Sequence, residues 1–178
     1  LRRIYCYGGT DMTDAPILRD AVRAILLTPA REVLLMRVVP PDGSTVFWIT
    51  PGGGLDAGEE AEVGLRRELR EELDLHAFEV GPLVFRRDHT FDWDGRRYRQ
   101  KERLYVVHVE RFEPRINDLD EARTIERMHW WPVDELRSMS ERVTPVELAK
   151  IVGTYLARRD AGAEAFAEWE VGSELLVD

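Results

Sequence analysis

Three glutamates, Glu68, Glu71 and Glu72, are spaced so that a helix would gather their carboxylates into one arc. At about 100° per residue, Glu71 lies roughly 60° to one side of Glu68, and Glu72 roughly 40° to the other. Like charges at these spacings repel, more strongly where water is partly excluded. Mg²⁺ and Mn²⁺ prefer carboxylate and carbonyl oxygens as ligands. This spacing, beside the glycine turn at 52–54, indicates a divalent-metal site.

The same segment also indicates how the acidic arc would be held. An apolar stripe beside the acids would be buried, which places the carboxylates at the edge of the core. Gly64 lies within the acidic arc, where we expect it to leave room for whatever approaches the carboxylates. Arg67 precedes Glu68 and can fix a neighbouring carboxylate. The stripe consists of Leu65, Leu69 and Leu73.

On composition alone, a helix rich in glutamate and arginine is more often a solvated surface. The spacing favours a site instead, because residues 53–75 resemble the signature of the Nudix hydrolases, G-x5-E-x7-R-E-U-x-E-E-x-G-U, where U is aliphatic. Asp74 replaces the second glycine at the turn that leaves the helix, where a left-handed residue is expected and Asp is tolerated. The other eight of the nine defined positions match: Gly53, Glu59, Arg67, Glu68, Leu69, Glu71, Glu72 and Leu75.

This resemblance implies a fold, an activity and a cofactor. The fold would be α+β (α/β/α layered), with a mixed β-sheet between helices and a loop-helix-loop motif. The activity would be that of a metal-dependent pyrophosphohydrolase, which cleaves a diphosphate bond in a nucleotide or nucleoside polyphosphate by attack of metal-activated water. The cofactor would be Mg²⁺, with Mn²⁺ as the alternative. An ADP-ribose or nucleotide-sugar pyrophosphatase and a non-enzymatic nucleotide sensor are the other interpretations; the presence of every signature carboxylate disfavours the sensor.

Carried over to this chain, the resemblance also assigns roles. Glu68, Glu71 and Glu72 would ligate the metal with the backbone carbonyl of Gly52. The catalytic set is Glu68 together with Glu59 and Arg67, of which the last two would pair and hold the loop to the helix.

Glu68 is the first choice for the group that takes the proton from water. An acid from a later loop is the alternative, with Glu121 and Glu126 as candidates. A solvated loop acid is at least as good an interpretation of each.

Local patterns predict the elements that must position these residues. A β-hairpin is expected over 21–27 and 32–38. A second hairpin is expected over 83–91 and 97–110, joined by an Asp-Gly turn within 92–95. The remaining predicted elements are a strand at 46–50, a helix at 59–73, a last strand at 128–131, a short helix at 132–137, and a helix at 145–159 with Thr144 as its N-cap.

The second hairpin carries a local net charge of +3, from seven Lys or Arg against four Asp or Glu in residues 86–103. Alternation puts Arg97, Arg99, Lys101 and Arg103 on one strand face, which would suit a polyphosphate. We therefore predict Arg97, Arg99 and Lys101 as substrate-binding residues. An exposed edge strand kept soluble by its charge is the alternative.

Aromatic residues on the same hairpin could stack a nucleobase, although cross-strand aromatic pairs more often serve packing. His108, in an apolar strand, is expected to be a hydrogen-bonded core residue. The hairpin aromatics are His89, Phe91, Trp93 and Tyr98, and the tryptophans expected mainly in the core are Trp48, Trp130 and Trp131.

Composition bounds the remaining possibilities. The 178 residues suggest a single domain over 17–160, with an N-terminal extension at 1–16 and an acidic C-terminal extension at 161–178. A net charge of −9 disfavours polymeric nucleic acid as a partner and leaves a nucleotide-type small molecule as the substrate. No apolar run is long enough to span a membrane. The single cysteine, Cys6, favours a reducing compartment such as the cytoplasm, and the sequence is compatible with a homodimer.

Overall fold

The computed structural model describes residues 15–115, 124–162 and 176–177. In this part of the chain, eight strands form one sheet, in the order β7-β3-β2-β1-β5-β4-β8, with β6 paired to β2. The strands are β1 (Ile17–Leu27), β2 (Glu32–Val38), β3 (Phe47–Ile49), β4 (Val80–Trp93), β5 (Arg96–His108), β6 (Ile125–Pro132), β7 (Arg142–Thr144) and β8 (Leu176–Val177). The helices are α1 (Ala61–Leu73), α2 (Leu148–Asp160) and the 3₁₀ helix η2 (Val133–Ser138).

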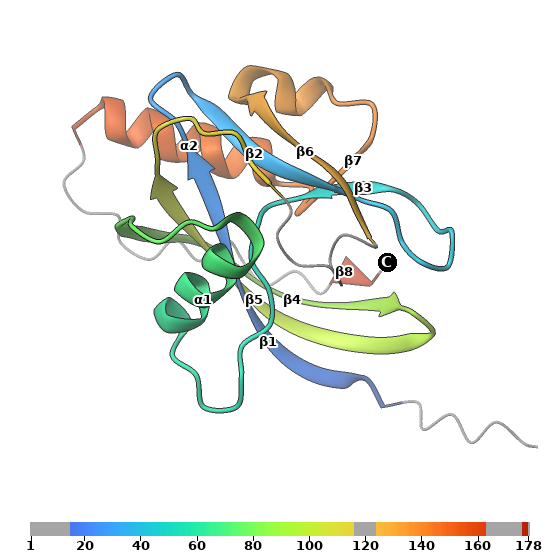
Figure 1. Ribbon diagram of the computed structural model, residues 1–178. Coiled ribbons are helices and arrows are strands. Elements are labelled where there is room, and N and C mark those ends of the chain that lie inside the picture. Colours follow the sequence, from blue (N-terminus) through green and yellow to red (C-terminus); the bar gives the residue numbers. More distant parts are fainter. Residues whose placement is uncertain (1–14, 116–123, 163–175, 178) are drawn as a thin grey trace, which may run out of the picture.

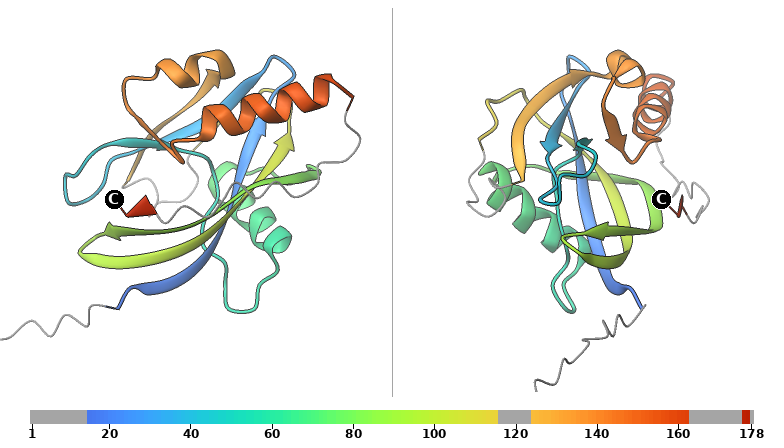
Figure 2. Two further views of the ribbon diagram at one scale, coloured as in Figure 1. Left: turned by 180° about the vertical axis from the view of Figure 1, so that it is seen from behind. Right: turned by 90° about the vertical axis from the view of Figure 1, so that its right-hand side faces the viewer.

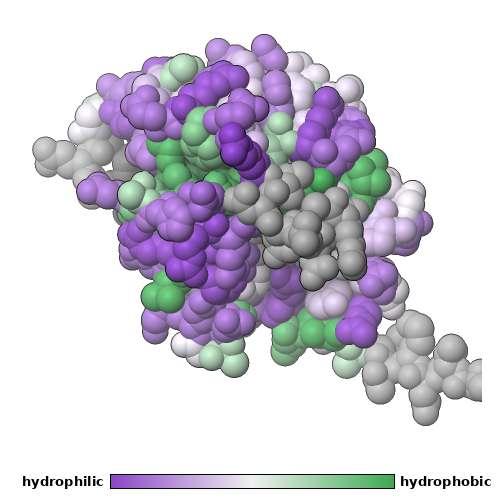
Figure 3. All heavy atoms as spheres, viewed as in Figure 1, coloured by the Kyte–Doolittle hydropathy of each residue, from purple (hydrophilic) through white to green (hydrophobic). Residues whose placement is uncertain are grey.

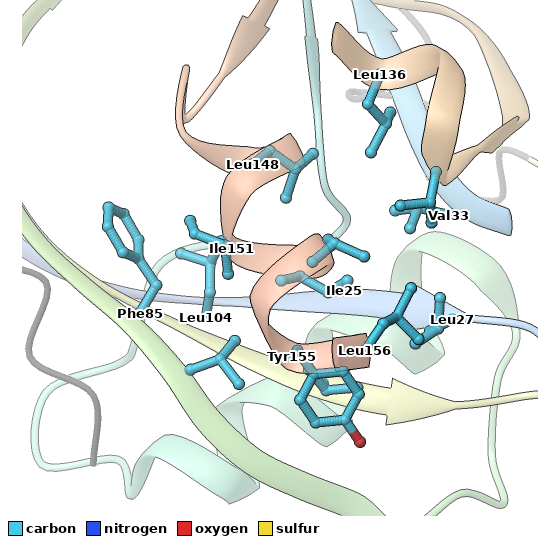
Figure 4. Close-up of a cluster of buried hydrophobic side chains, with 14 of the residues drawn as sticks. Ile25, Leu27, Val33, Phe85, Leu104, Leu136, Leu148, Ile151, Tyr155 and Leu156 are labelled. Atoms are coloured by element: carbon cyan, nitrogen blue, oxygen red, sulfur yellow. The ribbon is translucent and has the colours of Figure 1, made fainter. Parts of the chain in front are cut away.

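The sheet lies between the helices, as Figures 1 and 2 show. Successive residues of β1 point to opposite faces: Ile25 packs in the cluster that contains α2, while Ala24 and Leu26 pack in the cluster that contains α1. Figure 4 shows the α2 cluster, where Leu148 and Ile151 approach side chains from the sheet. β1 pairs in parallel with β5 and antiparallel with β2, so the sheet is mixed. The predicted α/β/α layering is therefore confirmed.

Both predicted hairpins are present. β1 turns into β2 through Thr28, whose carbonyl accepts a 3.0 Å hydrogen bond from the Arg31 amide. β4 turns into β5 through Asp94 and Gly95, which have φ values of 50° and 71°. This left-handed pair is the turn that an Asp-Gly sequence favours, because it matches the twist of the two strands.

The last predicted strand and the last predicted helix begin at other residues than expected. The strand expected at 128–131 begins at Ile125, and β7 and β8 follow it, so it is not the last. The helix expected from residue 145 begins at Leu148, with Glu147 as its N-cap. Thr144 is not the cap, because it ends β7, where it pairs with Ile49, and it precedes Pro145 through a cis peptide bond.

The tryptophans expected in the core are found there. Trp48 and Trp130 are buried, and Trp131 is partly buried against the α2 cluster. His108 is hydrogen-bonded to the Tyr155 hydroxyl at 2.7 Å but is exposed, so its assignment to the core is wrong. Neither α1 nor α2, nor any other helix in the described ranges, is long and apolar enough to cross a membrane.

Candidate functional site

Arg67 fastens the loop before α1 to the helix itself. Its guanidinium donates to both carboxylate oxygens of Glu59, at 3.0 and 2.8 Å, and to the Gly54 carbonyl at 2.9 Å. The loop is also tied to β1, because the Val22 amide donates to the Gly53 carbonyl at 2.9 Å. The hydrogen bonds from Arg67 lower the pKa of Glu59 to about 2, so this carboxylate stays charged at neutral pH. Glu59 lies in the loop, because α1 begins at Ala61 rather than at residue 59.

Gly64 and Asp74 shape the two ends of this unit. A Cβ at Gly64 would lie 2.2 Å from Leu55 Cδ2 and 2.9 Å from Glu59 Oε2. Gly64 thus makes room for the loop that packs on α1, and not for an approaching ligand as the sequence suggested. Asp74 ends the helix in the left-handed conformation, with φ 56° and ψ 29°, as expected for the position where it replaces glycine.

The three arc glutamates differ in their surroundings. Glu72 is 2% exposed, and its Oε2 accepts a 2.7 Å hydrogen bond from the Gly52 amide. Glu68 is 8% exposed and lies against Gly53, where a Cβ would approach its Oε2 to 2.4 Å. Glu71 is exposed, and Arg67 Nη1 donates both to it, at 3.2 Å, and to Glu68, at 2.7 Å. Figure 3 shows the outward surface around α1 as hydrophilic.

The chemistry of these donors fits a hard divalent cation. All are oxygens, and burial raises the pKa of Glu68 against the opposing effect of Arg67, so a further positive charge nearby would stabilise its charged form. Within the described residues, no three His, Cys, Asp or Glu side chains converge as a metal site. The positive charge beside Glu68 and Glu71 is supplied by Arg67.

A buried ionic network that the sequence did not reveal supports the glycine turn. Glu102 on β5 has no exposed side-chain surface, and it accepts hydrogen bonds from Arg23 Nε at 2.7 Å, from Gln100 Nε2 at 2.9 Å and from Arg87. Arg23 Nη1 in turn donates to the carbonyls of Thr50, at 2.9 Å, and Gly52, at 2.8 Å. Since Gly52 also binds Glu72, one chain of contacts joins β4, β5, β1 and α1.

Two arginines keep Glu102 ionised. Burial alone would raise the pKa of Glu102, but the charges of Arg87 and Arg23 and their hydrogen bonds lower it to about 2. Sequence reasoning counted Glu102 among the charges of the basic hairpin. The signal that could have separated it is its even-numbered position among basic residues at odd-numbered positions, which places it on the other face of the strand.

The basic residues at odd-numbered positions of β5 lie on the face opposite to Glu102. Arg99, Lys101 and Arg103 line a groove of about 640 Å³, together with 18–20 of β1 and the loop at 55–59. The structure does not bring these cations to Gly52, because the alternate residues of β5 form the Glu102 network. Their role in binding substrate phosphates, with that of Arg97, stays a prediction.

The structure also places β5 and Glu126, which bear on two alternatives for these segments. β5 lies between β1 and β4, so it is not an edge strand kept soluble by charge. Glu126 lies on β6, where it is exposed and forms an ion pair with Arg37, whose guanidinium also binds Glu141. Glu121 lies outside the described residues.

Replacement of Arg67 by alanine should lower both stability and activity. The change leaves the partly buried Glu59 and Glu68 without their counter-charge, and hydrogen bonds to charged groups contribute about 1.5 to 3 kcal/mol each. Arg66 is the matched control, because it is exposed and pairs with Glu62 on the helix surface. Thermal melting should separate the two variants. An unchanged melting temperature with only a raised KM would make Arg67 a substrate ligand instead.

Comparison with known proteins places this arrangement in a family. The NUDIX domain matches residues 17–150. A relative from Escherichia coli O139:H28 (strain E24377A / ETEC), described as nucleoside triphosphatase NudI, is 40% identical over 67 residues, which cover 35% of this chain and 44% of the relative. The match therefore spans less than half of that relative's length.

Solved structures share the fold. The MutT protein from Methanosarcina mazei Go1 superposes with a TM-score of 0.61 at 16% identity, over 81% of this chain and 96% of its own. A MutT/Nudix family protein from Listeria innocua has a TM-score of 0.59 at 21% identity, over 84% and 99%. The fold is thus the Nudix fold, and the domain match covers strands β1 to β7, helix α1 and the start of helix α2. The chain belongs to the Nudix family.

Proposed function

We propose that the chain is a metal-dependent pyrophosphohydrolase that cleaves a diphosphate bond in a nucleotide or nucleoside polyphosphate. The observation that carries this proposal is the acidic arc of α1 beside the glycine turn, where Arg67 binds Glu68 and Glu71 and the Gly52 amide binds Glu72. Membership of the Nudix family supports it, as does a relative described as a nucleoside triphosphatase.

Each residue has a part in the proposed reaction. Glu68, Glu71 and Glu72 would hold Mg²⁺ or Mn²⁺ with the Gly52 carbonyl, and such an ion supplies charge neutralisation at phosphate and a more acidic water. Glu68, which lies against Gly53, would accept the proton of the attacking water at its carboxylate. Arg67 and Glu59 would keep the loop and helix in register and would not contact the substrate.

Removal of divalent ions should abolish hydrolysis. A screen of nucleoside triphosphates, nucleoside diphosphates, ADP-ribose and nucleotide sugars with Mg²⁺ or Mn²⁺ should find at least one substrate, with phosphate and pyrophosphate release scored separately. Excess EDTA should reduce turnover to background, and added Mg²⁺ or Mn²⁺ should restore it. Melting in EDTA controls for loss of fold. Full turnover in excess EDTA would contradict the proposal.

The proposed location is the cytoplasm. A single cysteine, Cys6, leaves no intrachain disulfide to form, which suits a reducing compartment. The proposed partner is the nucleotide substrate alone, and a homodimer stays a prediction.

A further inference from the structure

The strand face that carries Glu102 continues toward the tip of the hairpin as a row of aromatic rings. Tyr98 follows on β5, and the cross-strand register places Phe91 of β4 opposite it and His89 opposite Gln100. The rings of His89 and Phe91 are 5.3 Å apart and 23° from parallel. Those of Phe91 and Tyr98 are 5.6 Å apart and 20° from parallel. These three partly buried residues form a nearly parallel ladder beside the ionic network.

The fourth hairpin aromatic does not belong to this ladder. Trp93 packs against a separate apolar cluster that contains Met36, Val38 and Ile49. The ladder rings share no apolar cluster of that kind in the described part of the chain. A stacked aromatic pair on one strand face offers a flat π surface. Proteins that bind single-stranded nucleic acid stack its bases on aromatic side chains, whichever base is present.

Arg19 lies on the same face, on the neighbouring strand. It pairs in register with Gln100, one alternation from Tyr98. A Cβ at Gly54 would lie 2.8 Å from Arg19 Nη2, so the guanidinium reaches the glycine turn where a side chain is missing. Among the described residues, Arg19 makes no hydrogen bond and no ion pair, although Glu68 and Glu102 are near enough to act on it electrostatically.

Arg23 and Arg19 differ in whether their N–H groups already have hydrogen-bond partners. Arg23 is committed to Glu102 and to two backbone carbonyls. Burial lowers the pKa of Arg19, and the neighbouring charge of Arg23 lowers it further, so the site holds a guanidinium whose charge is only partly balanced. A planar guanidinium with free N–H groups binds phosphate oxygens in pairs. Arg19 is therefore suited to an anion that lies between the ladder and the carboxylates.

We infer that this face is the nucleotide subsite, in which Phe91 and Tyr98 stack the nucleobase and Arg19 binds a phosphate next to the bond that is cleaved. Arg19 is next to the ladder on this face and is near enough to Glu68 of α1 to interact with it electrostatically, so the order ladder, Arg19, Glu68 matches the order base, phosphate, reacting diphosphate in a nucleoside polyphosphate. Neighbouring strands lie about 4.8 Å apart and alternate residues about 6.6 Å, which is the scale of one nucleotide. This inference rests on the proposed function and adds the part of the substrate that the chain recognises.

Binding measured without turnover tests the subsite. Isothermal titration calorimetry with Mg²⁺ would use the α,β-methylene analogues of ATP, GTP, CTP and UTP, and inorganic tripolyphosphate as the probe that lacks a base. Wild-type protein should bind at least one analogue. Tyr98→Leu should weaken that binding about 5- to 160-fold, the range expected when one base loses its stacking partner, and leave tripolyphosphate unaffected. Arg19→Ala should weaken the binding of both probes.

Matched controls lie on the same elements or carry the same charge. Tyr105→Leu removes a tyrosine from the opposite face of β5, where Tyr105 packs toward α1, and Lys150→Ala removes an exposed cation from α2. Both should bind the two probes as wild type does. Phe91→Leu replaces Tyr98→Leu if the latter does not fold, as judged by its melting curve.

The outcomes separate this inference from the proposed function. If Tyr98→Leu or Arg19→Ala binds the analogues as wild type does, or if wild type binds none of them, the subsite is wrong, even where hydrolysis is intact. If Tyr98→Leu weakens tripolyphosphate as much as the analogues, base stacking is also wrong. If the variants lose binding as expected but no nucleotide is hydrolysed, the subsite stands and the proposed function fails.

Discussion

Replacement of Glu72 by glutamine should lower kcat at least about 100-fold while the protein remains folded. Glutamine keeps the size of the side chain, and its amide oxygen can still accept the hydrogen bond from the Gly52 amide. The negative charge that would hold a divalent ion is lost. Loss of groups that merely orient metal ligands typically costs about 10- to 100-fold, so loss of a ligand should cost at least as much.

Glu62 provides the control for this variant. It lies on the same helix, is exposed, and pairs only with Arg66 in the described part of the chain. Glu62→Gln should therefore leave kcat and melting unchanged. Titration of Mn²⁺ should show weaker metal binding in Glu72→Gln alone. Turnover of Glu72→Gln within a few-fold of wild type would contradict the proposed metal site and would mean that the buried carboxylate only supports the turn.

The helix and its loop were predictable because their interactions are local. Spacings of three and four residues set which glutamates share a face of α1, and the Arg67–Glu59 contact spans only eight residues. The Asp-Gly turn between β4 and β5 was predictable for the same reason, since two adjacent residues decide its backbone conformation. Local sequence also supplied the left-handed end of the helix at Asp74.

The buried network was not predictable, because it depends on a strand register. Arg23 and Glu102 are 79 residues apart and meet only because β1 pairs in parallel with β5. Parallel pairing has no short connection that could fix its register from sequence. The end of β7 is similar: Thr144 has the features of a helix cap, but its pairing with Ile49 holds it in the sheet.

The basic hairpin shows how a charge count can mislead. A sum over residues 86–103 treats the two strands as one surface, whereas alternation sends Arg99 and Lys101 to one side of β5 and Glu102 to the other. Besides Arg67, two arginines contact the glycine turn or lie beside it. These two, Arg23 and Arg19, are in the predominantly apolar strand β1, where composition gave no indication of a site.

Replacement of Glu102 by alanine should destabilise the protein more than any exposed substitution. Arg23 and Arg87, which are 12% and 9% exposed, would remain inside without a counter-charge. Breaking a buried ion pair costs about 3 to 5 kcal/mol, or roughly 6 to 20 °C in melting temperature for a domain of this size. Glu110→Ala, at an exposed position just after β5, should change melting little. Adding Arg87→Ala to the Glu102→Ala variant should lower the free energy of unfolding by less than Arg87→Ala does alone. In the double variant, Glu102 is no longer present to be left as an unpaired buried charge.

Low pH should remove from the wild-type protein the stability that the ion pairs of Glu102 contribute. The pKa of Glu102 in the folded state, about 2, lies below its usual value of 4.5, so between these values the unfolded chain binds more protons. Stability should therefore be fully present above about pH 5 and fall as the pH approaches about 2. The pKa values of Glu59 and Glu141, also about 2, act in the same direction. The melting temperature of Glu102→Gln should be lower than that of wild type at neutral pH and should decrease less in acid, because one of these carboxylates is missing. A decrease as large as that of wild type would show that the buried carboxylate does not contribute to the acid sensitivity of the fold.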